Sequence, residues 1–141
     1  MRLVLDTNVV ASGLLWNGTP ARIIDAAQAG SIEIYTSRAL LTELTRILKR
    51  EKFAKVVAAS GLDIEGLVLG YAALALIVEP LPIPPTIIAD PDDDHVLACA
   101  LAAQAELIVS GDKHLLDLEG YQNIEIVTAA KSMERIRSVL S

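Results

Sequence analysis

Short apolar runs alternate with helical segments along the whole 141-residue chain. Two of these runs, at residues 3–5 and 107–109, contain no polar residue, which is typical of strands that are covered on both faces. Strands of this kind belong to parallel sheets that lie between layers of helices. The sequence therefore predicts an α/β fold, as a three-layer α/β/α sandwich with a central, mostly parallel sheet.

The other elements are expected where helical patterns and turn residues follow one another. Residues 6–18 are expected to form a loop, and prolines hold residues 81–85 in an extended connection. No repeat or linker divides the chain, so we expect a single domain over residues 1–141. The remaining strands are expected at 32–35, 76–79 and 124–127, and the helices at 20–29, 38–50, 53–59, 64–75, from the acidic turn to 103, 114–118 and after 128.

Composition restricts the class of protein. The single cysteine, Cys99, excludes an internal disulfide and fits a reducing compartment; we interpret it as a small core residue rather than a reactive thiol. No apolar run approaches the length of a membrane span, and no charged segment precedes a long apolar one at the N-terminus. We therefore expect a cytoplasmic protein that does not enter a membrane.

The net charge of −6 counts against a generic nucleic-acid binder, because phosphate contacts need local cations. A solvated helix face would explain the clustered cations, but a basic flank beside an acidic pocket is also what an RNA-cleaving enzyme needs. Arg46 and Lys49 face away from the leucine stripe of their helix and are the expected substrate-binding residues. The cluster consists of Arg38, Arg46, Lys49, Arg50, Lys52 and Lys55.

Acidic residues occur at three places that a parallel sheet would bring together. Asp6 ends the first apolar run and Asp112 follows the run at 107–109, and ligands bind outside the carboxyl ends of such strands. Each acid also has a structural explanation, as a turn residue or as a helix cap. Carboxylates that meet without soft ligands favour Mg²⁺ or Mn²⁺ over zinc. Between these two positions lie Asp90, Asp92, Asp93 and Asp94.

Acids in a first helical turn stabilise its free N–H groups, but several together repel one another unless a cation absorbs the charge. At 3.6 residues per turn, Asp94 lies on the line of Leu97 and Asp93 on the line of Val96. The helix is apolar nearly all round, so this geometry discriminates only modestly. Asp94 is favoured, and it stays open whether Asp92 or Asp93 shares its role.

Glu43 lies at the border of the apolar stripe of its helix, not on the opposite face with Arg46 and Lys49. A surface ion pair with Arg46, three residues further on, is the simpler explanation of this acid. His95 and His114 are isolated, and a solvated or hydrogen-bonded role outweighs metal binding for each.

Taken together, the motifs resemble those of PIN-domain proteins, the metal-dependent ribonucleases that include VapC-like toxins. They are Asp6-Thr7-Asn8-Val9, Glu43 on a helix, Asp94 opening an alanine-rich helix, and Ile108-Val109-Ser110-Gly111-Asp112-Lys113. The resemblance covers nearly the whole chain. Two features depart from it: His95 stands where related sequences often have asparagine, and the overall charge is acidic.

The resemblance implies a parallel sheet flanked by helices, one or two Mg²⁺ or Mn²⁺ ions, and hydrolysis of single-stranded RNA by the toxin of a toxin–antitoxin pair. Asn8 and Ser110 match polar positions that steady the acids. The expected partners are single-stranded RNA, a cognate antitoxin and a second copy of the chain in a homodimer. The implied catalytic residues and metal ligands are Asp6, Glu43, Asp94 and Asp112.

Two other functions match parts of the sequence. A haloacid-dehalogenase-like phosphatase would use Asp6 as nucleophile in an Asp-x-Asp-x-Thr motif, but here the third position is Asn8 and no threonine follows in register. A catalytically weak PIN-like scaffold would act through protein partners, but a scaffold has no need of the complete acid set.

Overall fold

The computed structural model describes residues 1–140 and contains a six-stranded sheet in the order β3-β2-β1-β4-β6-β5. Neighbouring strands are parallel except for β5, which pairs antiparallel with β6. The predicted α/β class with a mostly parallel sheet is therefore confirmed. The strands are β1 (Arg2–Leu5), β2 (Glu33–Thr36), β3 (Leu76–Ile77), β4 (Leu107–Val109), β5 (Gly120–Tyr121) and β6 (Ile124–Val127).

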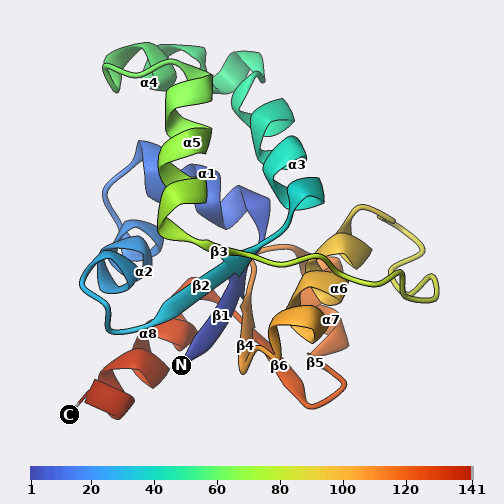
Figure 1. Cartoon of the computed structure of the whole chain (residues 1–141). Helices are drawn as coiled ribbons and strands as arrows, with labels where there is room; N and C mark the ends of the chain where they lie inside the picture. Colours follow the sequence, from blue (N-terminus) through green and yellow to red (C-terminus); the bar gives the residue numbers. More distant parts are fainter. Residues whose placement is uncertain (141) are drawn as a thin grey trace.

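Helices cover both faces of this sheet (Figure 1). α6 and α7 lie on one face, and α1, α2, α3, α5 and α8 pack on the other. Within residues 1–140 no single helix is long and apolar enough to cross a membrane; Glu51–Ala59 and Ile64–Leu74 pass by length and composition only as a pair bent by 77°. The helices are α1 (Thr7–Leu15), α2 (Thr19–Gln28), α3 (Arg38–Leu48), η1 (Glu51–Phe53), α4 (Ala54–Ala59), α5 (Ile64–Leu74), α6 (Asp93–Ala103), α7 (Lys113–Leu118) and α8 (Ala129–Leu140).

The alternation of side chains along the central strands divides the core in two. Leu3 and Leu5 of β1 point into the larger apolar cluster with α1, α2, α3, α5 and α8, whereas Val4 points into the cluster under α6 and α7. All three side chains are buried. Coverage on both faces explains why these strands are apolar throughout, since neither side meets water.

Side-chain caps fix the starts of α3 and α5. The Ser37 hydroxyl accepts the N–H of Leu40 at 3.4 Å at the start of α3, and Asp63 accepts the N–H of Gly66 at 2.7 Å at the start of α5. Each cap satisfies one of the N–H groups that the first turn of a helix leaves without a partner. These caps end the β2–α3 and α4–α5 connections at defined residues.

The segment after β1 differs from the prediction, because residues 7–15 form helix α1 instead of a loop. Gly13 lowers the helix propensity of this segment. A Cβ at Gly13 would stand 2.6 Å from Ile24 Cδ1 and 3.0 Å from the Pro20 carbonyl oxygen. The glycine is therefore required by the close crossing of α1 over α2, which the sequence pattern alone did not reveal. The two-residue strand β5 was not predicted either.

The carboxyl ends of the central strands meet at one edge of the sheet. The N–H of Asp6 donates to the Val109 carbonyl at 2.9 Å, and the N–H of Ser110 donates to the Val127 carbonyl at 3.0 Å. The residues that follow β1 and β4 are thus held in register by the sheet ladder itself. This edge carries the acidic residues.

Candidate metal centre

Three carboxylates converge at the carboxyl edge. Asp90 lies in the turn before α6, Asp93 is the first residue of α6, and Asp112 caps α7 just after β4. Each offers one oxygen atom, and these oxygens lie within 4.8 Å of one another. Like charges at this separation repel strongly in a partly desolvated site. The arrangement can hold a cation.

Asp93 is the most strongly perturbed acid of the group. Its side chain is only 5% exposed, and its Oδ2 atom is buried without a hydrogen-bond partner in the described chain. Burial, followed by repulsion from Asp112, Asp90, Asp6 and Glu43, raises the pKa of Asp93 to about 8. A buried carboxylate oxygen without a partner costs free energy unless a proton or a cation is bound to it.

Asp6 is held beside this group by Ser110. Ser110 Oγ donates to Asp6 Oδ2 at 2.8 Å and accepts the N–H of Asp112 at 2.9 Å, so one hydroxyl links the acids after β1 and β4. Burial and the charge of Asp112 raise the pKa of Asp6, against the opposing effect of the Ser110 hydrogen bond. Ser110 is itself fully buried, which fixes the orientation of its hydroxyl group.

Glu43 reaches the same site from α3. Thr7 Oγ1 donates to Glu43 Oε1 at 2.9 Å, which ties α3 to the start of α1 next to Asp6. Burial raises the pKa of Glu43, and repulsion from Asp6 and Asp92 adds to that effect. The side chain therefore faces the other acids, and is not merely one half of a surface pair with Arg46.

Asp94 lies outside the acidic group. Its Oδ1 accepts the N–H of Ile87 at 2.8 Å and its Oδ2 accepts the N–H of Thr86 at 3.1 Å. Both oxygens therefore anchor the segment before the acidic turn, and Asp93 occupies the place among the acids for which the sequence favoured Asp94. The reason is that α6 is buried nearly all round, so helical periodicity could not show which of two neighbouring residues faces the site.

A family model described as PIN domain matches residues 2–114, and these residues include every acid of the site. The chain belongs to the PIN-domain family. The match spans β1 to the start of α7, the part of the fold that brings the acids to one edge of the sheet. A comparison with curated proteins finds no match.

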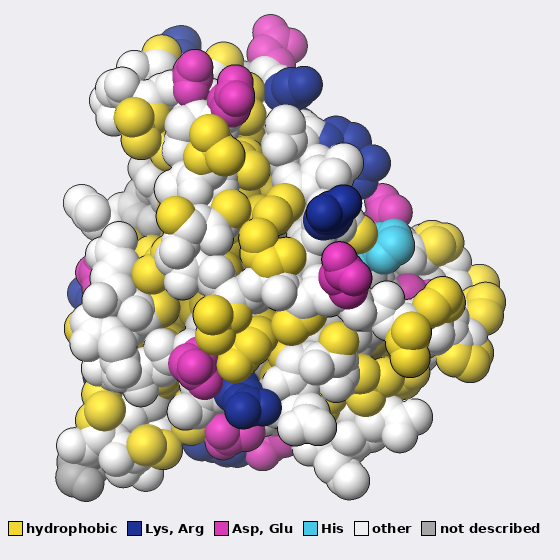
Figure 2. All heavy atoms as spheres, in the orientation of Figure 1, with side chains coloured by type: hydrophobic (Ala, Val, Ile, Leu, Met, Phe, Trp, Pro, Cys, Tyr) yellow, Lys and Arg dark blue, Asp and Glu magenta, His cyan; other side chains and the backbone are white. Residues whose placement is uncertain are grey.

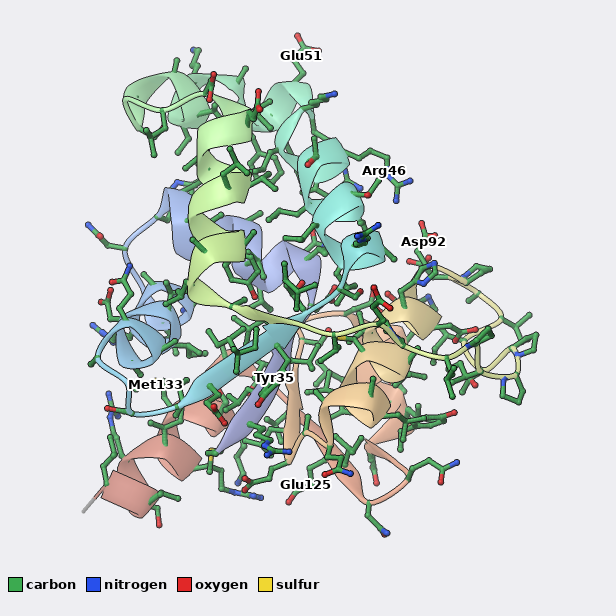
Figure 3. The ribbon with its side chains drawn as sticks, in the orientation of Figure 1. Tyr35, Arg46, Glu51, Asp92, Glu125 and Met133 are labelled. Atoms are coloured by element: carbon green, nitrogen blue, oxygen red, sulfur yellow. The ribbon has the colours of Figure 1, made fainter. Side chains whose placement is uncertain are left out.

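The remaining predicted site residues of this PIN domain lie around the acids. Asn8 is exposed and has no hydrogen bond to an acid within residues 1–140; its neighbour Thr7 makes that contact instead. Arg46 and Asp92 point toward one another from α3 and the acidic turn, with Arg46 Nη2 3.0 Å from Asp92 Oδ2 (Figure 3). Lys49 is exposed at the end of α3.

The side chains with potential for other chemistry lie apart from the acids or lack reactivity. Burial raises the pKa of Cys99 to about 12, so the PIN domain carries it as a neutral thiol inside the core. His114 contributes its backbone N–H, which donates to Asp112 Oδ1 at 2.7 Å, and its ring is exposed. The site is therefore built from oxygen donors, as the sequence predicted.

Two members of the acidic group, Asp90 and Asp93, were not assigned in advance. The run of aspartates indicates this turn, and the alignment of Asp93 with Val96 along the helix is the sequence signal for Asp93. Val96 and Ala100, one and two turns further on, are buried against the sheet, and this places Asp93 on the inner side of α6.

Proposed function

We propose that this PIN domain is a Mg²⁺- or Mn²⁺-dependent endoribonuclease that hydrolyses phosphodiester bonds of single-stranded RNA. The observation that carries the proposal is the buried Asp93 carboxylate, whose free oxygen lies among like charges with no basic side chain to compensate it within the described residues. Perturbed acids of this kind are typical of functional sites.

The donor set fits a hard divalent cation. Asp90, Asp93 and Asp112 would hold the ion, and Asp6 and Glu43 would complete the oxygen-only surroundings. When bound, such an ion supplies Lewis-acid chemistry: it polarises a phosphate oxygen and makes water more acidic. The ion would bind the free Oδ2 atom of Asp93, which accepts no hydrogen bond from any described donor.

The side chains around the acids position them for hydrolysis. Ser110 and Thr7 hold Asp6 and Glu43 in fixed rotamers through their hydroxyl groups. Glu43 is only half-buried and its pKa is raised, so its carboxylate is suited to take the proton from an attacking water. No protein nucleophile is required, and the protonated, buried Cys99 thiol is not suited to be one.

Cations beside the acids support a phosphate-containing substrate. Arg46 and Lys49 are exposed on the same helix that carries Glu43, and they offset the acidic pocket locally in a chain whose net charge is −6. We take the biological role to be that of the toxin of a toxin–antitoxin pair in the cytoplasm, with a cognate antitoxin and a second copy of the chain as partners. The resemblance to VapC-like toxins supports this role.

A cleavage assay with Mn²⁺ and single-stranded RNA tests the proposal. The wild type should cleave single-stranded RNA and leave double-stranded RNA largely intact, and a chelator should abolish the reaction. Asp6→Asn should lose activity and Mn²⁺ affinity in calorimetry, whereas the matched control Glu125→Gln, at the opposite edge of the sheet, should keep both. Absence of both cleavage and Mn²⁺ binding in the wild type would favour the scaffold, which acts through protein partners.

A further inference from the structure

Two hollows flank the acidic group along the carboxyl edge of the sheet. One, of about 470 Å³, opens at the ends of β3 and β2 and beside the first turns of α6. The other, of about 400 Å³, opens at the ends of β1, β4 and β6, where Ser110 and Asp112 line it. In the strand order β3-β2-β1-β4-β6, Asp6 after β1 lies between them, and Asp112 after β4 lines the second hollow. A single strand of nucleic acid can therefore pass along this edge and cross the acids.

The larger hollow has mainly apolar walls. They come from the proline-rich segment after β3, with Pro80, Pro82 and Ile83, and from Ala39 and Ala98 on the helices opposite. Figure 2 shows hydrophobic side chains gathered along this side of the molecule, next to basic, acidic and histidine side chains. Walls of this kind suit a flat apolar group with polar edges, because they can cover both of its faces.

The mouth of the hollow carries polar groups of both signs. Arg38 and His95 are exposed at the mouth as possible donors, and Glu79 is an exposed acceptor. Asp94 also lines the hollow, but both of its oxygens are already bound by backbone N–H groups. A nucleobase presents donors and acceptors at its edge and an apolar face, which matches this lining.

The position of the hollow relative to the acids fits a bound strand. The end of β2 is next to the end of β1, and the end of β3 lies two strand spacings, about 10 Å, from that of β1. Asp93 and Asp94 are consecutive residues, one in the acidic group and the other in the wall of the hollow. Arg38 and Arg46 are exposed on α3 and Lys49 is exposed just after it, so cations are present along this helix from the hollow past Glu43.

We propose that the hollow lined by residues 37–39, 78–83 and α6 binds one nucleobase of the single-stranded RNA substrate, close to the scissile phosphate. This subsite rests on the proposed nuclease function and adds a determinant of sequence preference to it. The base packs between the proline-rich segment and α6, and Arg38 contacts the adjoining phosphate. Leu81, which is 82% exposed at the rim, becomes buried when the base enters.

The test combines a filled hollow with RNAs that lack single bases. Ala39→Phe fills the hollow without replacing an acid, and Ala73→Phe makes the same change at an exposed position of α5 as a matched control. The substrates are one single-stranded RNA with a single cleavage site and copies of it with one abasic nucleotide at each position near that site. Melting temperature and Mn²⁺ affinity are measured for every variant, and Ile83→Ala replaces Ala39→Phe if the latter does not fold.

In the wild type, one abasic position should lower kcat/KM roughly tenfold, since stacking of one base contributes about 1–3 kcal/mol. Ala39→Phe should lower kcat/KM on intact RNA by a similar factor, leave Mn²⁺ affinity unchanged and become insensitive to the abasic change at that position. The two losses should not multiply, because they remove the same interaction. Ala73→Phe should behave as the wild type.

Three results would overturn the subsite. The wild type could cleave all abasic RNAs equally well, or the losses from Ala39→Phe and from the abasic position could multiply. Ala39→Phe could also cleave normally but change from a dimer to a monomer in gel filtration, which would assign the hollow to a second copy of the chain. A wild type that binds Mn²⁺ but cleaves no RNA at all, intact or abasic, shows instead that the nuclease function fails, and the subsite fails with it.

Discussion

Charged side chains are paired with opposite charges at one edge of the sheet and crowded with like charges at the other. At the amino edge, Arg2 lies 3.8 Å from Glu33, and Glu125 lies 2.8 Å from Arg135. Arg2, Glu33 and Glu125 are exposed, Arg135 is partly exposed, and each acid has a cation beside it. At the carboxyl edge the acids are drawn together, are partly or fully buried, and have one another as neighbours.

The pKa values of the acids at the two edges are shifted in opposite directions. The Arg135 hydrogen bond lowers the pKa of Glu125, whereas burial and like charges raise the pKa of Asp93 to about 8. A paired surface acid contributes little to stability and needs no ligand. Acids that are crowded and unpaired destabilise the fold unless a proton or a cation binds them, and such acids are typical of functional sites.

Substitution at the acidic edge should have the largest effect on activity. Asp93→Asn removes the free carboxylate oxygen, and we expect kcat to fall by more than the roughly 10–100-fold that loss of an outer-shell partner costs. Glu125→Gln at the amino edge should change kcat by less than about twofold. Single-turnover cleavage of single-stranded RNA measures both. Equal activity in wild type and Asp93→Asn would remove Asp93 from the proposed metal site.

Loss of Ser110 should have the next largest effect. Ser110→Ala deletes the hydroxyl that donates to Asp6 and accepts the N–H of Asp112. We therefore expect Mn²⁺ affinity or activity to fall roughly 10–100-fold. Ser132→Ala, which removes another fully buried hydroxyl from α8, is the control and should leave Mn²⁺ affinity unchanged. Calorimetry compares the two. The same loss in both variants would mean a general packing defect.

Asp94 should behave as a structural acid. Asp94→Ala leaves the N–H groups of Thr86 and Ile87 without their acceptor, and we expect the free energy of unfolding to fall by about 2 kcal/mol or more. Chemical denaturation of the metal-free protein measures this change. Asp92→Ala, in the same turn, should cost less than about 1 kcal/mol because its ion pair with Arg46 is exposed. Unchanged stability in Asp94→Ala would contradict the anchoring role.

Asp93 should make the metal-free protein less stable as the pH rises. The fold raises its pKa from 3.8 to about 8, so the folded state favours the protonated acid. Its stabilising contribution is fully present below about pH 4 and is lost as the pH rises through about 8. Asp93→Asn lacks this titration and should melt above the wild type at pH 8, with a smaller difference at pH 5. Melting curves recorded with a chelator test this; a difference that does not change with pH would contradict it.

The smallest effect on stability is expected at Arg46. Its ion pair with Asp92 is exposed, so Arg46→Ala should change the free energy of unfolding by less than about 1 kcal/mol. RNA binding should still weaken, and the slope of log affinity against log salt should fall by about one if Arg46 contacts a phosphate. Arg135→Ala at the amino edge is the control and should leave that slope unchanged. An unchanged slope in Arg46→Ala would place the substrate path elsewhere.

Strands and caps could be predicted because their causes are local. The apolar run of β4, the caps Ser37 and Asp63, and the turn residues around them follow from the properties of a few neighbouring residues. Helix α1 could not be predicted in the same way. Its glycine has a tertiary cause, the close approach of α2, and no property of the segment itself reveals that contact.

The site residues also differ in whether their positions have local or tertiary causes. Asp6 and Asp112 follow strands, and the register of a parallel sheet brings the ends of strands together, so their position could be inferred. Asp93 and Asp94 differ only in which way each side chain points from a helix that is buried nearly all round. Which of the two faces the site depends on the path of the chain before the helix, where the N–H groups of residues 86 and 87 donate to the Asp94 carboxylate.

The anchoring of Asp94 has a mechanical consequence. The segment that ends at residues 86 and 87 is joined to the first turn of α6 through Asp94, so a shift of these residues would turn the helix start and displace the Asp93 carboxylate with it. The wall of the hollow would discriminate between substrates, and the Asp93 carboxylate would hold the ion. These two parts would thus move together. Where two ligands bias the same movement, each changes the affinity of the other by the same factor. A substitution that displaces residues 86 and 87 would therefore alter ion affinity without touching a ligand.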